Sequence, residues 1–170
     1  MLNLRKKSAR KADAGRLYGA LVARSRAPVF FTAFGVPDTM DGRFDLIALH
    51  GWLALAQLKA GGRDDQAQAL TDAIFIGFDE ALREQGTGDM GMGRKMKAFA
   101  DAFFGRLAAY DSAASTEELA VAIARNLYRA GAPDARTRAL AAYAATARES
   151  LRNSEGLDYG PLPVAETATM

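Results

Sequence analysis

The sequence contains no cysteine and only one histidine, His50, among its 170 residues. Without cysteine, the chain cannot form disulfides, thiolate metal sites or a cysteine nucleophile. With one histidine it cannot build a His-rich metal site or an HExxH helix, and a Ser-His-Asp triad would have to use His50. The composition therefore disfavours an enzyme and offers no residue that we expect to hold a metal or cofactor.

Long hydrophobic runs are also missing. The most apolar window, residues 46–58, is well short of the ~20 residues that span a bilayer, and it contains His50 and Gln57. Basic residues interrupt the N-terminal region before any run long enough for a secretion signal. The sequence predicts a protein that is soluble, or at most bound to a membrane surface.

Charge is unevenly distributed although the net charge is only +2. Residues 1–27 hold eight basic residues and one acid, whereas the remainder holds fourteen basic and nineteen acidic residues. Two interpretations of this basic arm stay open. It is either a solvated, partly disordered terminus or a surface that contacts anionic lipid headgroups or RNA.

The apolar residues recur at helical spacing, and no segment alternates like a strand. We expect an all-α fold, a single multihelical domain of about seven helices. The domain plan is a basic N-terminal arm (1–12), a helical domain (13–153) and an irregular C-terminal tail (154–170). The apolar residues of this tail can lie along the body. The predicted helices span approximately 13–26, 28–35, 39–60, 64–85, 93–110, 115–131 and 133–150.

The third predicted helix is apolar nearly all round, which indicates a central, buried element. His50 lies on it. A lone histidine in such a place is more typical of a hydrogen-bonded core residue than of a ligand. A haem or metal ligand is the alternative, but the sequence supplies no co-ligands.

Gly86, Gly88 and Gly91 form the pattern G-x-G-x-x-G, which is typical of dinucleotide binding. That function requires a strand before the glycines and a helix after them. Here the preceding segment is helical, so the match is accidental. The basic residues that follow, at positions 94, 95 and 97, oppose the positive end of the helix dipole. They are either without consequence or a receptor for an acidic partner.

Carboxylates are clustered at two places. Asp38, Asp41 and Asp45 surround Arg43 at a helix start, where acids suit the helix dipole. Residues 64–72 lack the D-D-x-x-D spacing with which helical prenyl-transferring enzymes hold magnesium. A helical enzyme acting on an isoprenoid or lipid is therefore disfavoured.

Three stretches, residues 17–50, 86–111 and 123–128, together resemble the ubiquinol-cytochrome c chaperone family. The resemblance extends from residue 17 to about residue 150. It implies an all-helical assembly factor for the cytochrome bc1 complex, not an enzyme, that binds newly made cytochrome b and no DNA. The chain closely resembles bacterial members, so we expect a cytoplasmic protein, with peripheral binding to the inner membrane as an option, and do not interpret residues 5–16 as a transit peptide.

The family motifs suggest where partners bind. A chaperone for a membrane protein needs an apolar groove of adaptable side chains with a charged rim, and the methionines at 90, 92 and 96 fit this need. Phe44, Met96 and His50 are interpreted as packing residues. The alternative function is a helical module that binds a membrane surface, RNA or the ribosome through the basic arm, without a bc1-specific client. The candidate partner-binding residues are Asp38, Asp41, Arg43, Asp89, Met92, Arg94, Lys95 and Lys97.

Overall fold

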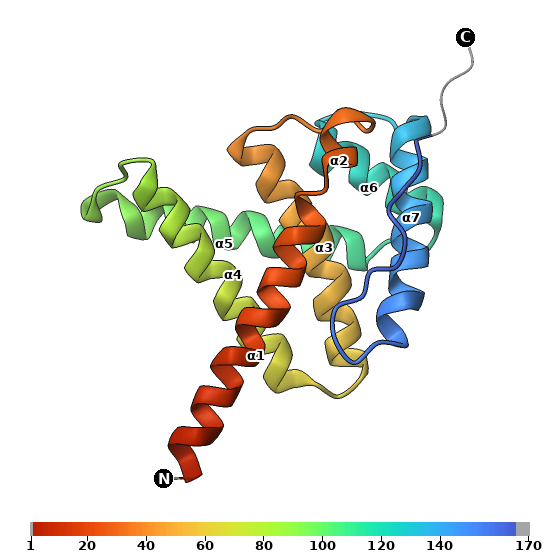
Figure 1. The fold of residues 1–170 in the computed structure, drawn as a ribbon. Coiled ribbons are helices and arrows are strands. Elements are labelled where there is room, and N and C mark those ends of the chain that lie inside the picture. Colours follow the sequence, from red (N-terminus) through yellow and green to blue (C-terminus); the bar gives the residue numbers. More distant parts are fainter. Residues whose placement is uncertain (1, 166–170) are drawn as a thin grey trace.

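A computed structural model describes residues 2–165, with side chains from Leu4 onward. It confirms the all-α prediction, and this part of the chain contains no strand. Figure 1 shows the helices gathered around one of their number, α3. The helices are α1 (Leu2–Ser25), α2 (Pro28–Thr32), α3 (Met40–Ala60), α4 (Asp64–Glu84), α5 (Asp89–Asp111), α6 (Thr116–Tyr128) and α7 (Ala135–Arg152).

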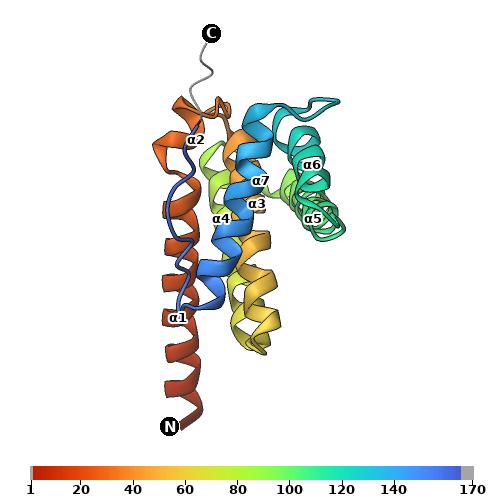
Figure 2. The same cartoon turned by 90° about the vertical axis from the view of Figure 1, so that its right-hand side faces the viewer.

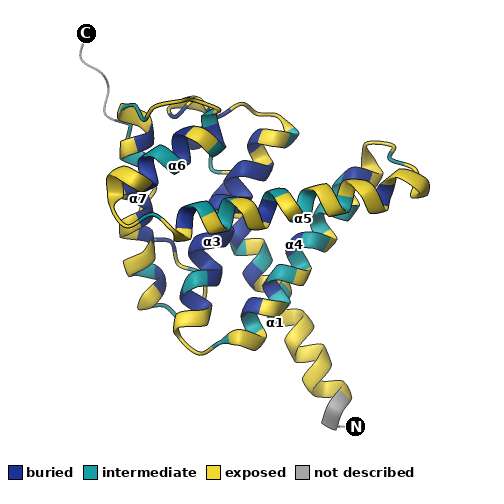
Figure 3. Ribbon diagram, turned by 180° about the vertical axis from the view of Figure 1, so that it is seen from behind, coloured by how far each residue is buried: buried dark blue, intermediate teal, exposed yellow. Residues whose placement is uncertain are grey.

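Helix α3 is the centre of the fold, as its sequence predicted. It packs against α1, α4, α5, α6 and α7. Seen from behind, α3 is almost entirely buried, whereas α5 and α7 keep an exposed face (Figure 3). A helix surrounded in this way can be apolar on every side, because no face of it needs to meet water.

The start of α3 is fixed by a cap and by a close backbone approach. The hydroxyl of Thr39 accepts a hydrogen bond from the amide of Gly42 at 3.2 Å. A Cβ on Gly42 would lie 1.9 Å from the carbonyl oxygen of Pro37. The turn into α3 therefore requires glycine at this position.

Helix α1 begins at Leu2, whereas the sequence analysis placed its start at Asp13. The earlier start has a physical reason, since residues 2–12 contain no glycine or proline and are rich in good helix formers. The basic arm is thus the first part of α1, and it extends away from the body (Figures 1 and 3). It is helical where the structure describes it, and Arg10 pairs with Asp65 of α4 at 2.7 Å.

Other helix boundaries differ by a few residues. Helix α5 begins at Asp89, four residues earlier than predicted, with Gly88 as its N-cap. Helix α2 ends at Thr32, and α6 ends at Tyr128. Glycine lowers helix propensity but does not prevent a helix whose following turns make tertiary contacts. For this reason the predicted start of α5, at Gly93, lies too far along the chain.

The tail runs back over the body beside α1 and α7 (Figures 1 and 2). Tyr159 is buried and donates a hydrogen bond to the carbonyl of His50 at 3.1 Å, while Arg24 donates to the carbonyl of Gly160. The expectation that tail residues lie along the body is thereby confirmed for Tyr159 and the half-buried Leu157. Leu162 and Val164 are instead exposed. The predicted tail also includes residues 166–170, which lie outside the described residues.

Candidate functional site

His50 is fully buried, and its ring nitrogens both have partners. Nδ1 lies 2.8 Å from the carbonyl oxygen of Leu46 and Nε2 lies 2.9 Å from the hydroxyl of Tyr143. A carbonyl only accepts, so Nδ1 carries the proton and Nε2 accepts from Tyr143. Burial lowers the pKa of His50 to about 3, and the hydrogen bond to Leu46 opposes this shift. His50 is a core histidine, as predicted.

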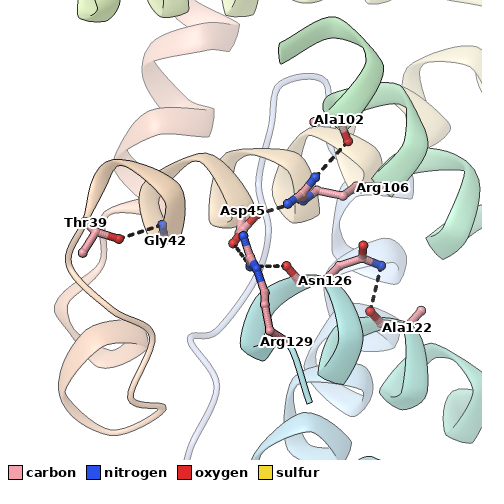
Figure 4. Close-up of polar contacts among 8 residues, drawn as sticks. All are labelled: Thr39, Gly42, Asp45, Ala102, Arg106, Ala122, Asn126 and Arg129. Carbon is pink, nitrogen blue, oxygen red and sulfur yellow. Dashed lines mark hydrogen bonds and ion pairs between the residues drawn. The ribbon is translucent and has the colours of Figure 1, made fainter. Parts of the chain in front are cut away.

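Asp45 forms a buried ion-pair cluster that the sequence analysis did not find. Its side chain is 1% exposed. Oδ1 lies 2.8 Å from Nε of Arg106 on α5, and Oδ2 pairs with Nη1 of Arg129 directly after α6 (Figure 4). One carboxylate therefore connects the start of α3, the C-terminal part of α5 and the end of α6.

The charged cluster predicted around Arg43 does not include Asp45, which pairs with Arg106 and Arg129 instead. Asp45 lies on the inner side of α3, whereas Asp38 and Asp41 are exposed. Desolvation by burial raises the pKa of the Asp45 carboxyl, although both guanidinium groups act to lower it. Because both carboxylate oxygens have arginine partners, the cluster stabilises the packing of the helices and is not an open ligand site. The only sequence signal for its arginines was that Arg106 lies within, and Arg129 next to, a motif stretch.

The predicted partner-binding residues fall into two groups in space. Asp38, Asp41 and Arg43 lie at the start of α3, where Arg43 pairs with Asp38 at 2.7 Å. The second group lies at the start of α5, on the projecting end of the α4–α5 hairpin (Figure 1). The fold therefore does not gather the eight residues into one site.

The cations at the start of α5 are exposed, and two of them have neighbours. Lys97 pairs with Asp101 at 2.9 Å, and Lys95 donates to the hydroxyl of Thr87 at 2.9 Å. Asp89 pairs with Arg83 at 2.9 Å, and Arg94 is exposed on the first turns of the helix. Thr87, Asp89 and Asp101 supply nearby oxygens that moderate the unfavourable position of these cations beside the helix dipole.

The three methionines at the start of α5 differ in their exposure to solvent. Met92 is only 6% exposed, Met96 is half-buried and Met90 is fully exposed. Helical geometry gives the reason, because at 100° per residue Met92 and Met96 share one face and Met90 lies on nearly the opposite one. Met92 therefore packs inside, contrary to its expected exposure as a partner contact.

A cleft of about 420 Å³, here called the aromatic cleft, lies between α1, α3, α4 and α5. The ring centroids of Phe44, Phe78 and Phe99 are 5.1–5.3 Å apart in pairs. Phe44 is buried, but Phe78 and Phe99 are half-exposed. Of the eight predicted partner-binding residues only Arg43 lines this cleft. Its apolar walls are formed chiefly by Tyr18, Val22, Phe44, Ile47, Phe78 and Phe99.

Comparison with known proteins identifies the family. The sequence profile described as "Ubiquinol-cytochrome C chaperone" matches residues 32–160. The chain belongs to the ubiquinol-cytochrome C chaperone family. A crystal structure described as the Cbp3 homolog from Brucella abortus is 35% identical, with a TM-score of 0.79, and the match covers 91% of this chain and 88% of that one.

A relative from Xenopus laevis bears the name ubiquinol-cytochrome-c reductase complex assembly factor 1. It is 25% identical over 130 residues, which is 74% of this chain. The match spans 65% of the length of that relative. The chaperone-family profile includes all three members of the Asp45 cluster and excludes the whole of α1.

No helix within residues 2–165 is both long and apolar enough to cross a bilayer. Over the same part of the chain, no group of three or more acidic or histidine side chains is placed to hold a metal ion. Two buried titratable groups, His50 and Asp45, are engaged in internal contacts.

Proposed function

We propose that this protein is an assembly chaperone for the cytochrome bc1 complex and that its client is newly made cytochrome b. The observation that carries the proposal is the family match over residues 32–160, supported by a fold match that covers most of the chain. The name of the Xenopus relative associates that protein with assembly of the same reductase complex. Cytochrome b as the client is the more specific part of the proposal, which rests on the family resemblance.

The proposed role requires no chemistry on the client. His50 is sealed in the core between Leu46 and Tyr143, so it cannot reach a substrate. Asp45 is engaged by two arginines. We infer that the protein acts by binding and release, and that the surfaces that matter are apolar or charged and open to solvent.

Co-purification tests the client directly. The tagged protein is isolated from cells pulse-labelled during synthesis of the bc1 subunits, and the retained labelled subunits are identified. We expect cytochrome b to be enriched over the other subunits of the complex. Equal recovery of all subunits, or none, would contradict cytochrome b as the client.

A second candidate function uses the basic part of α1. Residues 5, 6, 7, 10 and 11 are all basic and exposed, on a helix that extends beyond the body (Figure 3). Each basic residue near an anionic membrane contributes about 1 kcal/mol to binding. A variant lacking residues 1–12 is compared with the whole protein in sedimentation with liposomes and with ribosomes, at low and high salt. Binding that is lost both on deletion and at high salt supports this role.

A further inference from the structure

The aromatic cleft is a consequence of how α1 and α4 cross. A Cβ on Gly77 of α4 would lie 1.9 Å from the hydroxyl oxygen of Tyr18, so the two helices touch there. Beyond this point they diverge toward their C-terminal ends (Figure 1). The space between them is only partly filled, and the rings of Phe78 and Phe99 remain half-exposed in it. Stacked aromatic rings open to solvent favour an apolar occupant.

The rim of the cleft carries both signs of charge. Arg26 follows the end of α1, Arg43 lies in the first turn of α3, and Glu84 is the last residue of α4. Arg26 and Glu84 are exposed and take no part in the ion pairs formed among residues 4–165. These two charges are therefore free to pair with a ligand.

The cleft does not end at its arginines. A second depression of about 430 Å³, lined by Phe31, Thr32 and Asp38, shares both Arg26 and Arg43 with it. The two depressions adjoin at these arginines and are together called the groove. Arg43 is paired with Asp38, whereas Arg26 is open. Each depression has the volume of a small-ligand pocket, and apolar side chains on either side of Arg26 suit an extended or helical segment.

We propose that this groove binds an apolar segment of a partner polypeptide, with an acidic side chain of that segment facing Arg26, because Arg43 is already paired with Asp38. A basic or amide side chain of the same segment faces Glu84. A fatty acid has only one charged end and an apolar chain, so it leaves Glu84 unmatched. A polypeptide segment presents both signs and apolar anchors together, which is the complement of this rim and its aromatic floor. The identity of the partner as cytochrome b rests on the proposed function, whereas the chemistry of the segment does not.

Two labelled synthetic helical peptides provide the probe. They have the same leucine and phenylalanine face and differ in one flanking residue, glutamate in one peptide and lysine in the other. Fluorescence anisotropy measures their dissociation constants for the whole protein. We expect the glutamate peptide to bind about fivefold more tightly, as one solvent-accessible charge pair allows. In Arg26→Glu the preference reverses in favour of the lysine peptide.

A second variant blocks the groove without changing charge. Ala81 is half-buried on the wall of the cleft, so Ala81→Trp fills it and weakens both peptides by about tenfold or more. Ala145→Trp, on the exposed face of α7, is the matched control and leaves both affinities unchanged. Lys59→Glu, at the far end of α3, controls for the loss of a surface cation outside the groove. Because Arg26 is exposed and unpaired within the described residues, its reversal tests the proposal even where Ala81→Trp impairs folding.

The possible outcomes distinguish failure of the groove proposal from failure of the client proposal. Peptide discrimination that reverses in Arg26→Glu supports the groove even where cytochrome b does not co-purify, and only the proposed function then fails. Cytochrome b that co-purifies equally with wild type, Arg26→Glu and Ala81→Trp, together with unchanged peptide affinities, overturns the groove and leaves the function standing. Displacement of both peptides by oleate without discrimination between them assigns the groove to a lipid and also overturns the proposal.

Discussion

Asp45 and Arg106 are 61 positions apart in the sequence, yet Oδ1 of Asp45 lies 2.8 Å from Nε of Arg106. The carboxylate is buried, and the Arg106 side chain is 16% exposed. Arg106 also lies over the ring of Phe44, with 4.8 Å from its Cζ to the ring centroid, and donates to the carbonyl of Ala102 at 3.1 Å. This pair therefore connects the ion-pair cluster to the floor of the aromatic cleft.

Replacing only one partner of this pair is expected to lower the free energy of unfolding. Asp45→Leu leaves the guanidinium of Arg106 without its carboxylate in a poorly hydrated place. We expect a loss of about 3 kcal/mol in the free energy of unfolding, at the lower end of the range for a buried pair because Arg129 remains half-exposed. Urea unfolding measures this loss. The double variant Asp45→Leu/Arg106→Met should be more stable than Asp45→Leu, since no unpaired charge then stays buried, and a double variant that is less stable would contradict this account.

The start of α3 gives a prediction about glycine. Gly42→Ala places a methyl group against the carbonyl oxygen of Pro37, and backbone atoms cannot move aside easily. We expect destabilisation by about 1–3 kcal/mol, despite the better helix propensity of alanine. Gly93→Ala is the matched control. Its Cβ would meet nothing within 4 Å, so that variant should be more stable by about 0.5–1 kcal/mol. Thermal unfolding of both variants measures these changes. Equal shifts in their midpoint temperatures would show that the turn into α3 tolerates a side chain.

His50 predicts a pH dependence of stability. Its pKa is about 3 in the folded protein and about 6.5 in the unfolded chain, so the unfolded state binds more protons between these values. The contribution of His50 to the free energy of unfolding is fully present above pH 6.5 and is lost as the pH falls toward 3. At pH 5 the loss is about 2 kcal/mol, at roughly 1.4 kcal/mol per pH unit.

Because His50 is the only histidine, no other imidazole contributes to this titration. The measurement is the urea midpoint at several values between pH 5 and 8, above the range in which most carboxylates titrate. His50→Gln, tested as the control, should show a nearly flat profile over this interval. A wild-type profile that is equally flat would mean that the folded protein protonates His50 without cost.

The basic residues at the start of α5 stay candidate partner contacts. In Lys95→Glu/Lys97→Glu the exposed surface there changes from basic to acidic, and the pair between Lys97 and Asp101 is lost. We expect recovery of cytochrome b by co-purification to fall about fivefold or more, as reversal of charge at an interface rim does. Lys59→Glu, at the far end of α3, is the control. Undiminished recovery with a folded variant would remove this surface from the account.

Periodicity predicted the helices and the central position of α3, because each depends on the local order of apolar residues. Thr39 and Ser115 cap α3 and α6 by accepting hydrogen bonds from the amides of Gly42 and Glu118, as residues of these types commonly do. Helix starts were less predictable. The start of α1 at Leu2 depends on propensity alone, and α5 begins among glycines that were interpreted as a loop.

Local sequence patterns could not predict the contacts between helices. Nothing in the sequence near Asp45 indicates that Arg106 and Arg129 will surround it, because the crossing of α3 with α5 and α6 decides this. The aromatic cleft depends in the same way on Tyr18 meeting Gly77. Met92 shows the reverse case, in which a residue type suited to partner binding is buried by the register of its helix.

The central claim concerns assembly of the bc1 complex, and deletion of the gene tests it most directly. Membranes of the deletion strain are assayed for the haem absorbance of cytochrome b and for ubiquinol-cytochrome c reductase activity, with the wild-type gene restored as the control. The account predicts that both fall strongly and that both return with the restored gene. Normal cytochrome b and normal reductase activity in the deletion strain would contradict it.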